Sequence, residues 1–204
     1  MKAVIICDGD IPEKEKIERA LSDADIFIAA DGGVLRAREL GFQPDIIIGD
    51  LDSYSITGQE KAQVIKDEDQ ETNDLEKALS FALKKSANSA IVFGATGKRL
   101  DHTLKNLSVL LQFDSRFDSI TFLDDYAELS VIHSPFKKSF EIGTIISLFP
   151  LSGKVEGIST NGLKYPLNNE ALENGVRDGS SNEAVEETVE IKFKKGDLLL
   201  LTHH

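Results

Sequence analysis

The sequence predicts two domains of different architecture. An N-terminal α/β domain with a mostly parallel sheet is expected over residues 1–124, and an all-β antiparallel sandwich over residues 125–204. Two observations favour this division. The first half alternates short, almost entirely apolar runs with helical patterns, as a parallel sheet covered on both faces requires. The second half alternates apolar and polar residues with a period of two, and glycines punctuate it.

The strands expected in the first half are apolar runs that suit burial on both faces of a sheet. They lie at 3–7, 26–30, 46–49, 90–95 and 120–123. Helical patterns fall between several of these runs. One predicted helix follows Pro12, and a second covers 75–83, where apolar residues repeat at the spacing of a core-facing helix. A third is expected to bury Leu104, Leu107 and Leu111.

The second half carries the alternation of strands that are buried on one face only. Leu129 and Val131 alternate with polar neighbours, and so do Val189, Ile191 and Phe193. Frequent glycines supply turn signals between these short segments. The change of period places the domain boundary near residues 120–127.

The composition limits the classes of partner. The chain has 204 residues and a net charge of -12 without a cluster of basic residues, so neither nucleic acid nor a membrane is expected as a partner. The single cysteine, Cys7, excludes an intrachain disulfide and fits a reducing compartment. No uncharged run approaches the roughly 18 residues of a membrane helix, and the N-terminal apolar run is too short for a signal peptide. We therefore expect a cytoplasmic protein.

Aspartates follow the predicted strands of the first half, at the sheet edge where ligands bind in open parallel sheets. They are Asp31, Asp50, Asp52 and Asp101, with Asp74 at the start of the helix over 75–83. Two carboxylates ~4 Å apart repel each other by about 4 kcal/mol at an effective dielectric of 20, so a hard cation is expected between them. Oxygen-only ligands favour magnesium over zinc, and magnesium keeps positions for substrate phosphates. The implied substrate is a nucleotide.

Two alternatives compete with this interpretation. A single aspartate after a strand is more often a turn former or a helix cap than a ligand, and Asp74 is a good candidate for a cap. The convergence of several acids on one edge favours the metal site. Asp8 and Asp10, after the first run, resemble the aspartyl pair of haloacid-dehalogenase-like phosphatases, although Pro12 stands where threonine or valine is expected.

Several longer motifs resemble those of bacterial thiamine pyrophosphokinases and occur in the same order. They are ADGG at 30–33, PDIIIGDLDS at 44–53, NDLEKAL at 73–79, GATGKRLDHTLKNL at 94–107, NGLKYPL at 161–167 and GSSNE at 179–183. The resemblance implies an N-terminal ATP- and magnesium-binding domain and a C-terminal thiamine-binding sandwich. It also implies a homodimer with active sites at the subunit interface. The implied reaction transfers the pyrophosphoryl group of ATP to thiamine and releases AMP.

The resemblance also implies a role for individual residues. The magnesium ligands would be Asp50, Asp52 and Asp74. The nucleotide would contact Asp31, Asn73, Gly94, Thr96, Arg99, Asp101 and His102. Thiamine would contact Gln70, Ser181 and Asn182. The catalytic groups would be Asp74, Asp101, Lys77 and Arg99, with Lys77 or Arg99 stabilising charge on the AMP leaving group. Asp74, Asp101, phosphate or water would accept the proton of the alcohol.

The chain departs from the family pattern at two positions. Asn73 stands where the family commonly has threonine, which replaces a hydroxyl by an amide. Lys98 stands where the family commonly has glycine, which adds a cation to the loop before Arg99. A magnesium-dependent phosphate-ester hydrolase and a nucleotide-binding regulatory protein remain the alternative functions.

Overall fold

The structure, a computed structural model, describes residues 1–52, 54 and 60–204 and confirms the predicted combination of an α/β region with an antiparallel β domain. The chain forms two compact units, Met1–Asp125 and Tyr126–His204. Ser53, the last residue of the PDIIIGDLDS motif, lies outside the described residues.

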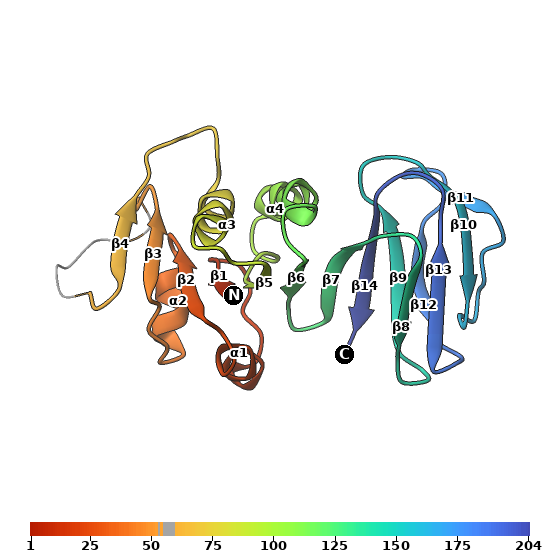
Figure 1. The fold of residues 1–204 in the computed structure, drawn as a ribbon, viewed down its shortest axis with the longest axis horizontal. Helices are drawn as coiled ribbons and strands as arrows, with labels where there is room; N and C mark the ends of the chain where they lie inside the picture. Colours follow the sequence, from red (N-terminus) through yellow and green to blue (C-terminus); the bar gives the residue numbers. More distant parts are fainter. Residues whose placement is uncertain (53, 55–59) are drawn as a thin grey trace. The chain divides into compact units, whose positions relative to one another are not determined.

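Parallel strands form the sheet of the first unit, in the order β6-β5-β1-β2-β3-β4 (Figure 1). Their bounds are β1 (Lys2–Ile6), β2 (Ile26–Ala30), β3 (Ile46–Gly49), β4 (Gln63–Lys66), β5 (Ser89–Phe93) and β6 (Ser119–Leu123). Every residue of β2 and β3 is buried, which is why these segments read as unbroken apolar runs.

Helices cover both faces of this sheet. They are α1 (Lys14–Leu21), α2 (Gly33–Glu39), α3 (Asp74–Lys84) and α4 (Leu100–Asp114). Figure 1 shows α1 and α2 on one face of the sheet and α3 and α4 on the other. Ile17 of α1 and Val34 of α2 pack into one core with Val4, Phe27 and Ile47 of the strands. The predicted double covering of the sheet is therefore present.

The buried face predicted for α4 is wrong. The helix buries Asn106, Val109, Leu110 and Phe113, whereas Leu104 is 57% exposed. Both faces of α4 carry apolar residues at helical spacing, and periodicity alone does not tell which of them meets the sheet. The leucine repeat is real but lies on a different face from the core.

Two short elements, helix α2 and strand β4, were not predicted from the sequence. Helix α2 has 7 residues, too few to show a full amphipathic repeat. Strand β4 is the edge strand and none of its four residues is buried, so it lacks the apolar run of the central strands. Neither segment was predicted, because a pattern method needs either length or burial.

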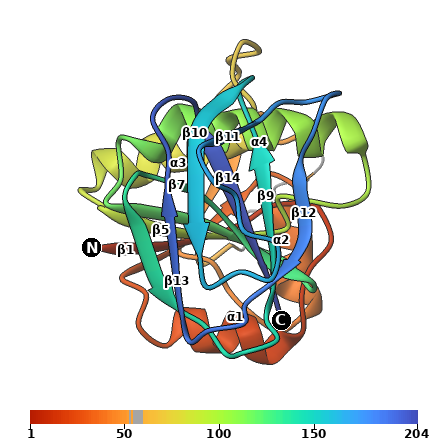
Figure 2. The same cartoon turned by 90° about the vertical axis from the view of Figure 1, so that its right-hand side faces the viewer.

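The second unit consists of antiparallel strands in two sheets (Figure 2). One sheet has the order β12-β9-β14-β7 and the other β11-β10-β13-β8. The bounds are β7 (Ala127–Ile132), β8 (Phe136–Ser139), β9 (Ile145–Pro150), β10 (Val155–Asn161), β11 (Glu170–Leu172), β12 (Gly179–Glu183), β13 (Thr188–Lys192) and β14 (Leu198–His203). Ile146 and Leu200 of the first sheet share one core with Ile158 and Ile191 of the second, so the sheets form a sandwich.

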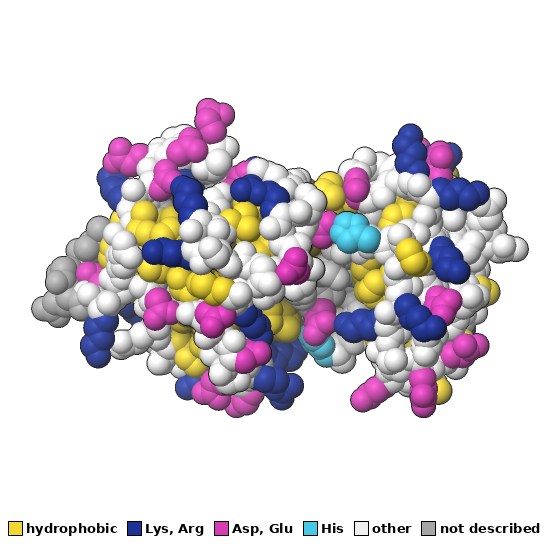
Figure 3. Space-filling view, viewed as in Figure 1, with side chains coloured by type: hydrophobic (Ala, Val, Ile, Leu, Met, Phe, Trp, Pro, Cys, Tyr) yellow, Lys and Arg dark blue, Asp and Glu magenta, His cyan; other side chains and the backbone are white. Residues whose placement is uncertain are grey.

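Charge is mixed on the surface. On the face drawn in Figure 3, basic and acidic side chains are both spread over the surface, and several acidic ones gather at the upper left. Within the described residues, no helix is both long enough and apolar enough to cross a bilayer.

Candidate active site

The strand order of the first unit reverses at β1. The chain runs from β1 through β2 and β3 to β4 on one side, then returns through α3 to β5 and β6 on the other. Ligands of open parallel sheets bind outside the carboxyl ends of the strands at such a point. A cleft of about 280 Å³ lies there, between the segments that follow β1, β2 and β5 and the first turns of α3 and α4. Its lining includes Cys7, Asp31, Asp74, Thr96, Lys98 and His102.

Glycines allow the loops after β1 and β5 to touch backbone to backbone. A Cβ atom on Gly9 would lie 2.1 Å from the carbonyl oxygen of Thr96, and one on Gly94 would lie 2.5 Å from that of Cys7. Gly9 N–H donates to the carbonyl of Gly94 at 2.9 Å. Any side chain at these positions would separate the two loops, so the glycines set the width of the cleft floor.

Three of the predicted acids converge on one point. Carboxylate oxygens of Asp31, Asp50 and Asp52 all lie within 4.8 Å of one another. Asp74 borders the same place, because a Cβ on Gly49 would lie 2.7 Å from Cβ of Asp31 and 3.0 Å from Oδ1 of Asp74. Magnesium binds oxygen ligands at about 2.1 Å in an octahedron, so oxygens at these separations need only small shifts to share one ion. The donor set therefore fits magnesium.

The pKa values of Asp50 and Asp74 are shifted in opposite directions. The N–H of Asp52 donates to Oδ1 of Asp50 at 3.1 Å, and this bond, the largest contribution, lowers the pKa of Asp50. Burial raises the pKa of Asp74, and the negative charge of Asp31 adds to that rise. Without a cation, Asp74 therefore holds a proton more tightly than an ordinary aspartate does. Burial also raises the pKa of Cys7 to about 12, so its thiol is not a nucleophile.

Asn73, rather than Asp74, is the cap of α3. Its Oδ1 accepts from Glu76 N–H at 2.9 Å, and Glu76 Oε2 accepts from Asn73 N–H at 2.9 Å, which completes a capping box. Asp74 is thereby left at the first helical position with its carboxylate toward the acid cluster. Lys77 lies one turn further, with its side chain only 3% exposed and Nζ 3.6 Å from Asp74 Oδ1.

A buried amide connects α3, α4 and the loop after β5. Asn106 donates from Nδ2 to the carbonyl of Ala95 at 2.8 Å and accepts on Oδ1 from Nδ2 of Asn73 at 2.9 Å. The amide of Asn73 is therefore engaged on both sides by the protein. The sequence analysis missed Asn106, although a polar residue on the buried face of a helix is the signal that marks it.

The remaining nucleotide candidates lie on the loop and the first turn after β5. Thr96 donates from Oγ1 to Oδ2 of Asp124 at 2.9 Å. Arg99 and Asp101 form an exposed ion pair with Nη2 and Oδ2 2.5 Å apart, and the hydrogen bond from Arg99 lowers the pKa of Asp101. Gly94, Arg99 and His102 line the cleft. The structure thus brings the basic part of this loop to the cleft and pairs Asp101 with its neighbour.

Gln70 lies near the acid cluster. Its Nε2 is 3.5 Å from Oδ2 of Asp50 and 3.4 Å from the carbonyl of Glu68, and the side chain is exposed. Gln70, the thiamine contact that the resemblance implies, therefore lies in the first unit beside the metal candidates.

The other thiamine candidates lie in the second unit, on β12. Asn182 is 8% exposed, and its Nδ2 and Oδ1 bind the carbonyl and the N–H of Tyr165 at 2.8 and 3.0 Å. Ser181 is exposed, and its N–H donates to Ser147 Oγ at 3.0 Å. Asn182 thus fixes the loop that presents Tyr165, which is 64% exposed. Tyr165 was not singled out from the sequence, although an aromatic residue between a glycine and a proline turn suggests an exposed ring.

The phosphatase alternative finds no support in the geometry of Asp8. Oδ1 of Asp8 accepts from Nε of Arg36 at 3.0 Å and from Nζ of Lys98 at 2.9 Å. A carboxylate oxygen bound by two cations is a poor nucleophile.

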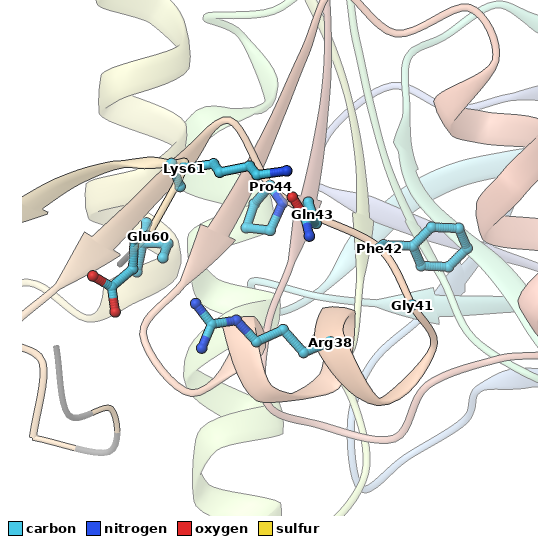
Figure 4. A pocket seen from close by; sticks show the side chains of 9 residues that line it. Arg38, Gly41, Phe42, Gln43, Pro44, Glu60 and Lys61 are labelled. Atoms are coloured by element: carbon cyan, nitrogen blue, oxygen red, sulfur yellow. The ribbon is translucent and has the colours of Figure 1, made fainter. Parts of the chain in front are cut away.

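A second hollow of about 350 Å³ lies at the opposite edge of the sheet, beside the segments that precede β3 and β4. Figure 4 shows the guanidinium of Arg38 extending from α2 toward Glu60, and the side chain of Lys61 beside Pro44 and Gln43. None of the residues predicted to act on substrate lines this hollow. The acids and the nucleotide loop instead identify the cleft at β1 and β5 as the candidate active site.

Two family models match this chain, one within each unit. Residues 17–122 match the family model described as thiamin pyrophosphokinase, catalytic domain, and residues 132–198 match the model described as thiamin pyrophosphokinase, vitamin B1 binding domain. The chain is 29% identical over 187 residues to thiamine pyrophosphokinase of Bacillus subtilis, covering 86% of each chain. It is 32% identical over 188 residues to thiamine pyrophosphokinase 1 of Oryza sativa, covering 82% of this chain and 68% of the relative.

Solved structures share the fold. Thiamin pyrophosphokinase from Geobacillus thermodenitrificans superposes with a TM-score of 0.81 at 25% identity, over 100% of this chain and 98% of the other. Thiamine pyrophosphokinase from Bacillus subtilis gives 0.83 at 23% identity, over 100% and 99%. On these matches, and in agreement with its motifs, the chain belongs to the thiamin pyrophosphokinase family.

Proposed function

We propose that this family member transfers the pyrophosphoryl group of ATP to the hydroxyethyl oxygen of thiamine in the cleft at the carboxyl ends of β1, β2 and β5, and releases AMP. The observation that carries the proposal is the convergence of Asp31, Asp50 and Asp52 within 4.8 Å, at a cleft that Asp31, Lys98 and Arg99 line. Phosphoryl-type transfer depends on positioning and on neutralising charge, and this arrangement supplies both.

We assign magnesium to Asp31, Asp50 and Asp52, with Asp74 beside them. When bound, the ion neutralises phosphate oxygens and orients the chain of phosphates. The low pKa of Asp50 keeps this carboxylate charged and ready to coordinate. The family resemblance implies Asp74 as the third ligand beside Asp50 and Asp52, whereas the separations of the carboxylate oxygens favour Asp31 in that place.

Two basic residues are assigned to the charge that develops on AMP. Lys77 is buried next to Asp74, so its ammonium is fixed in position and acts in a poorly solvated place. Arg99 lies on the exposed loop and forms a surface ion pair with Asp101, which phosphate can replace.

The proton of the thiamine alcohol needs an acceptor. Of the two carboxylates considered for it, Asp74 is the better base in the metal-free protein, because its pKa is raised while that of Asp101 is lowered. Asp101 is assigned instead to holding Arg99.

Thiamine is assigned to Gln70 in the first unit and to the loop around Tyr165 and Ser181 in the second. An exposed tyrosine ring suits a cationic thiazolium, and hydroxyl and amide groups suit the aminopyrimidine. Asn182 supports this loop through its two hydrogen bonds to the Tyr165 backbone.

We further propose a cytoplasmic homodimer in which one site uses the first unit of one chain and the second unit of its partner. The family resemblance suggests this arrangement. It is supported by the exposed leucines of α4, with Leu100 71% and Leu104 57% exposed on one helix face, since contiguous exposed apolar side chains commonly mark interfaces.

An assay for AMP tests the function. AMP is expected only when thiamine, ATP and magnesium are all present. Phosphate release without thiamine would favour the hydrolase alternative, and nucleotide binding without turnover would favour a regulatory protein. Either result would contradict the proposed transfer.

A further inference from the structure

We propose that Lys98 is a nucleotide-binding residue whose ammonium group is bound to Asp8 in the nucleotide-free protein and moves to the phosphates when ATP binds. The inference rests on the proposed function, because it requires that the cleft at β1 and β5 binds ATP.

The backbone does not favour lysine at position 98. Lys98 has a φ of 51° and follows Gly97, whose φ is 84°. Left-handed backbone of this kind strains a residue that carries a Cβ atom and suits glycine. Because the backbone conformation at this position favours glycine, a lysine here has a role only through its side chain. Its side chain lines the same cleft as Asp31 and Asp74.

The ion pair of Lys98 is arranged so that it can be broken. Nζ of Lys98 donates to Oδ1 of Asp8 at 2.9 Å, and Nε of Arg36 donates to the same oxygen at 3.0 Å. Asp8 therefore keeps a cationic partner when Lys98 leaves. The side chains of Lys98 and Asp8 are 36% and 52% exposed, and a pair this accessible to water contributes little to stability.

When ATP fills the cleft, its phosphates offer the ammonium group of Lys98 a stronger partner than Asp8. One wall carries Asp31 and Asp74, which repel any phosphate oxygen that magnesium does not cover. The loop after β5 lines the same cleft and carries Lys98 and Arg99, two cations adjacent in sequence. A phosphate group offers more charge and more acceptor oxygens than one carboxylate oxygen that is already shared with Arg36. Lys98 therefore exchanges Asp8 for the nucleotide.

This exchange makes Asp8 a competitor of ATP for the same ammonium group. Removing the charge of Lys98 weakens ATP binding, whereas removing the charge of Asp8 strengthens it. A pair that only ties the loops after β1 and β5 together would respond in the same direction to both changes.

The experiment measures the binding of ATP with magnesium, without thiamine, by titration calorimetry. Lys98→Gln keeps an unbranched polar side chain and the backbone strain but loses the charge, and it is expected to weaken ATP binding by about five- to 50-fold. Lys98→Arg is expected to restore most of the affinity. Asp8→Asn is expected to tighten binding by about two- to fivefold, and only when Lys98 is present. Lys84→Gln, at the far end of α3, removes the same net charge and is expected to change little.

Each other outcome overturns the proposal. Unchanged affinity in Lys98→Gln means that Lys98 does not touch the nucleotide. Equal weakening by Asp8→Asn and Lys98→Gln identifies a loop clamp. A gain from Asp8→Asn that persists in the double variant identifies a general charge effect. If any of these results occurs while the unmodified protein makes AMP from thiamine and ATP, only this inference fails. A protein that neither binds nor consumes ATP overturns the proposed function as well.

Discussion

Asp74 shows how a neighbouring residue fixes the position of a side chain and how burial and nearby charges set its pKa. The capping box of Asn73 and Glu76 starts α3, so Asp74 takes the first helical position instead of the cap. From the sequence, Asp74 was predicted as a metal ligand with a helix cap as the alternative, and the cap is the neighbouring Asn73, because both asparagine and aspartate are good caps. Which of the two turns inward depends on the approach of Gly49 and Asp31, and these contacts are not local in sequence.

We predict that Asp74→Asn stabilises the metal-free protein at neutral pH. Burial and the charges of Asp31 and Asp50 raise the pKa of Asp74, so the folded chain binds its proton more tightly than the unfolded chain does. The free energy of unfolding contributed by Asp74 therefore falls as pH rises from its ordinary pKa through the raised one. Asparagine carries no such penalty.

Urea unfolding in a chelator checks this prediction. The variant is expected to be more stable than the unmodified protein at pH 7, and the difference is expected to shrink toward pH 4. Added magnesium should stabilise the unmodified protein more than the variant, because binding to the folded state adds stability. A variant that is less stable than the unmodified protein at pH 7 in the chelator would contradict the assigned charge repulsion.

The paired acids of GDLDS give a second prediction at this scale. Asp50→Asn and Asp52→Asn each remove a proposed metal ligand without changing its shape, so turnover is expected to fall by at least about 100-fold while the fold is kept. Initial rates across a magnesium titration and a circular dichroism spectrum measure the two effects. Asp23→Asn, a surface acid paired with Lys2, is the matched control. Near-normal rates of both variants at limiting magnesium would contradict the assignment of Asp50 and Asp52 as magnesium ligands.

At the scale of elements, patterns predicted what was long or fully buried. The central strands and the helix over 75–83 were evident because burial on every face leaves unbroken apolar runs or strong periodicity. Helix α4 was also found, but its core-facing side was assigned to the leucine repeat. Asn106 occupies the true buried face, and a polar residue there looks like an error until its partners are known.

We predict that Asn106→Ala destabilises the protein by about 2 kcal/mol or more, since the Ala95 carbonyl and the side-chain Nδ2 of Asn73 each lose their partner at a cost of about 1–3 kcal/mol. Better helix propensity returns only about 0.5 kcal/mol, so the lost hydrogen bonds decide the sign. Urea unfolding measures the change. Ser108→Ala, exposed on the same helix, should alter stability by less than about 0.5 kcal/mol. Equal effects of the two substitutions would show that the hydrogen bonds of Asn106 to Ala95 and Asn73 contribute nothing to stability.

At the scale of the whole molecule, the division into an α/β and an antiparallel β region was predictable because the hydrophobic period changes from one half to the other. The convergence of the acids Asp31, Asp50 and Asp52 was also predictable, because parallel strands bring their carboxyl ends to one edge of the sheet. What the exposed leucines of α4 contact was not predictable, because a periodic pattern reports an apolar face and not what covers it. The homodimer is a proposal about that face.

We predict that Leu104→Glu produces a monomer that keeps its fold. Leu104 is 57% exposed within the chain, so a charge there costs the monomer little, but a charge buried without a partner in an interface is strongly unfavourable. Light scattering measures the mass, and thermal unfolding checks the fold. Leu35→Glu, on α2 and 42% exposed, is the control and should leave the mass unchanged. If the Leu104→Glu variant remained a dimer, the exposed leucine face of α4 would not be the dimer interface.

The last prediction tests whether each site draws on both chains. We expect Asp52→Asn to disable the first unit and Tyr165→Ala to disable the second. In a mixed dimer, one site then receives both changes and the other receives neither. After equal amounts of the two variants exchange subunits, about half of the dimers are mixed, so about a quarter of all sites are intact. Thiamine-dependent AMP formation should rise to about that fraction of the unmodified rate, although each variant alone is nearly inactive. If each site belonged to a single chain, every site in the mixture would carry one defect and the rate would stay at the level of the separate variants.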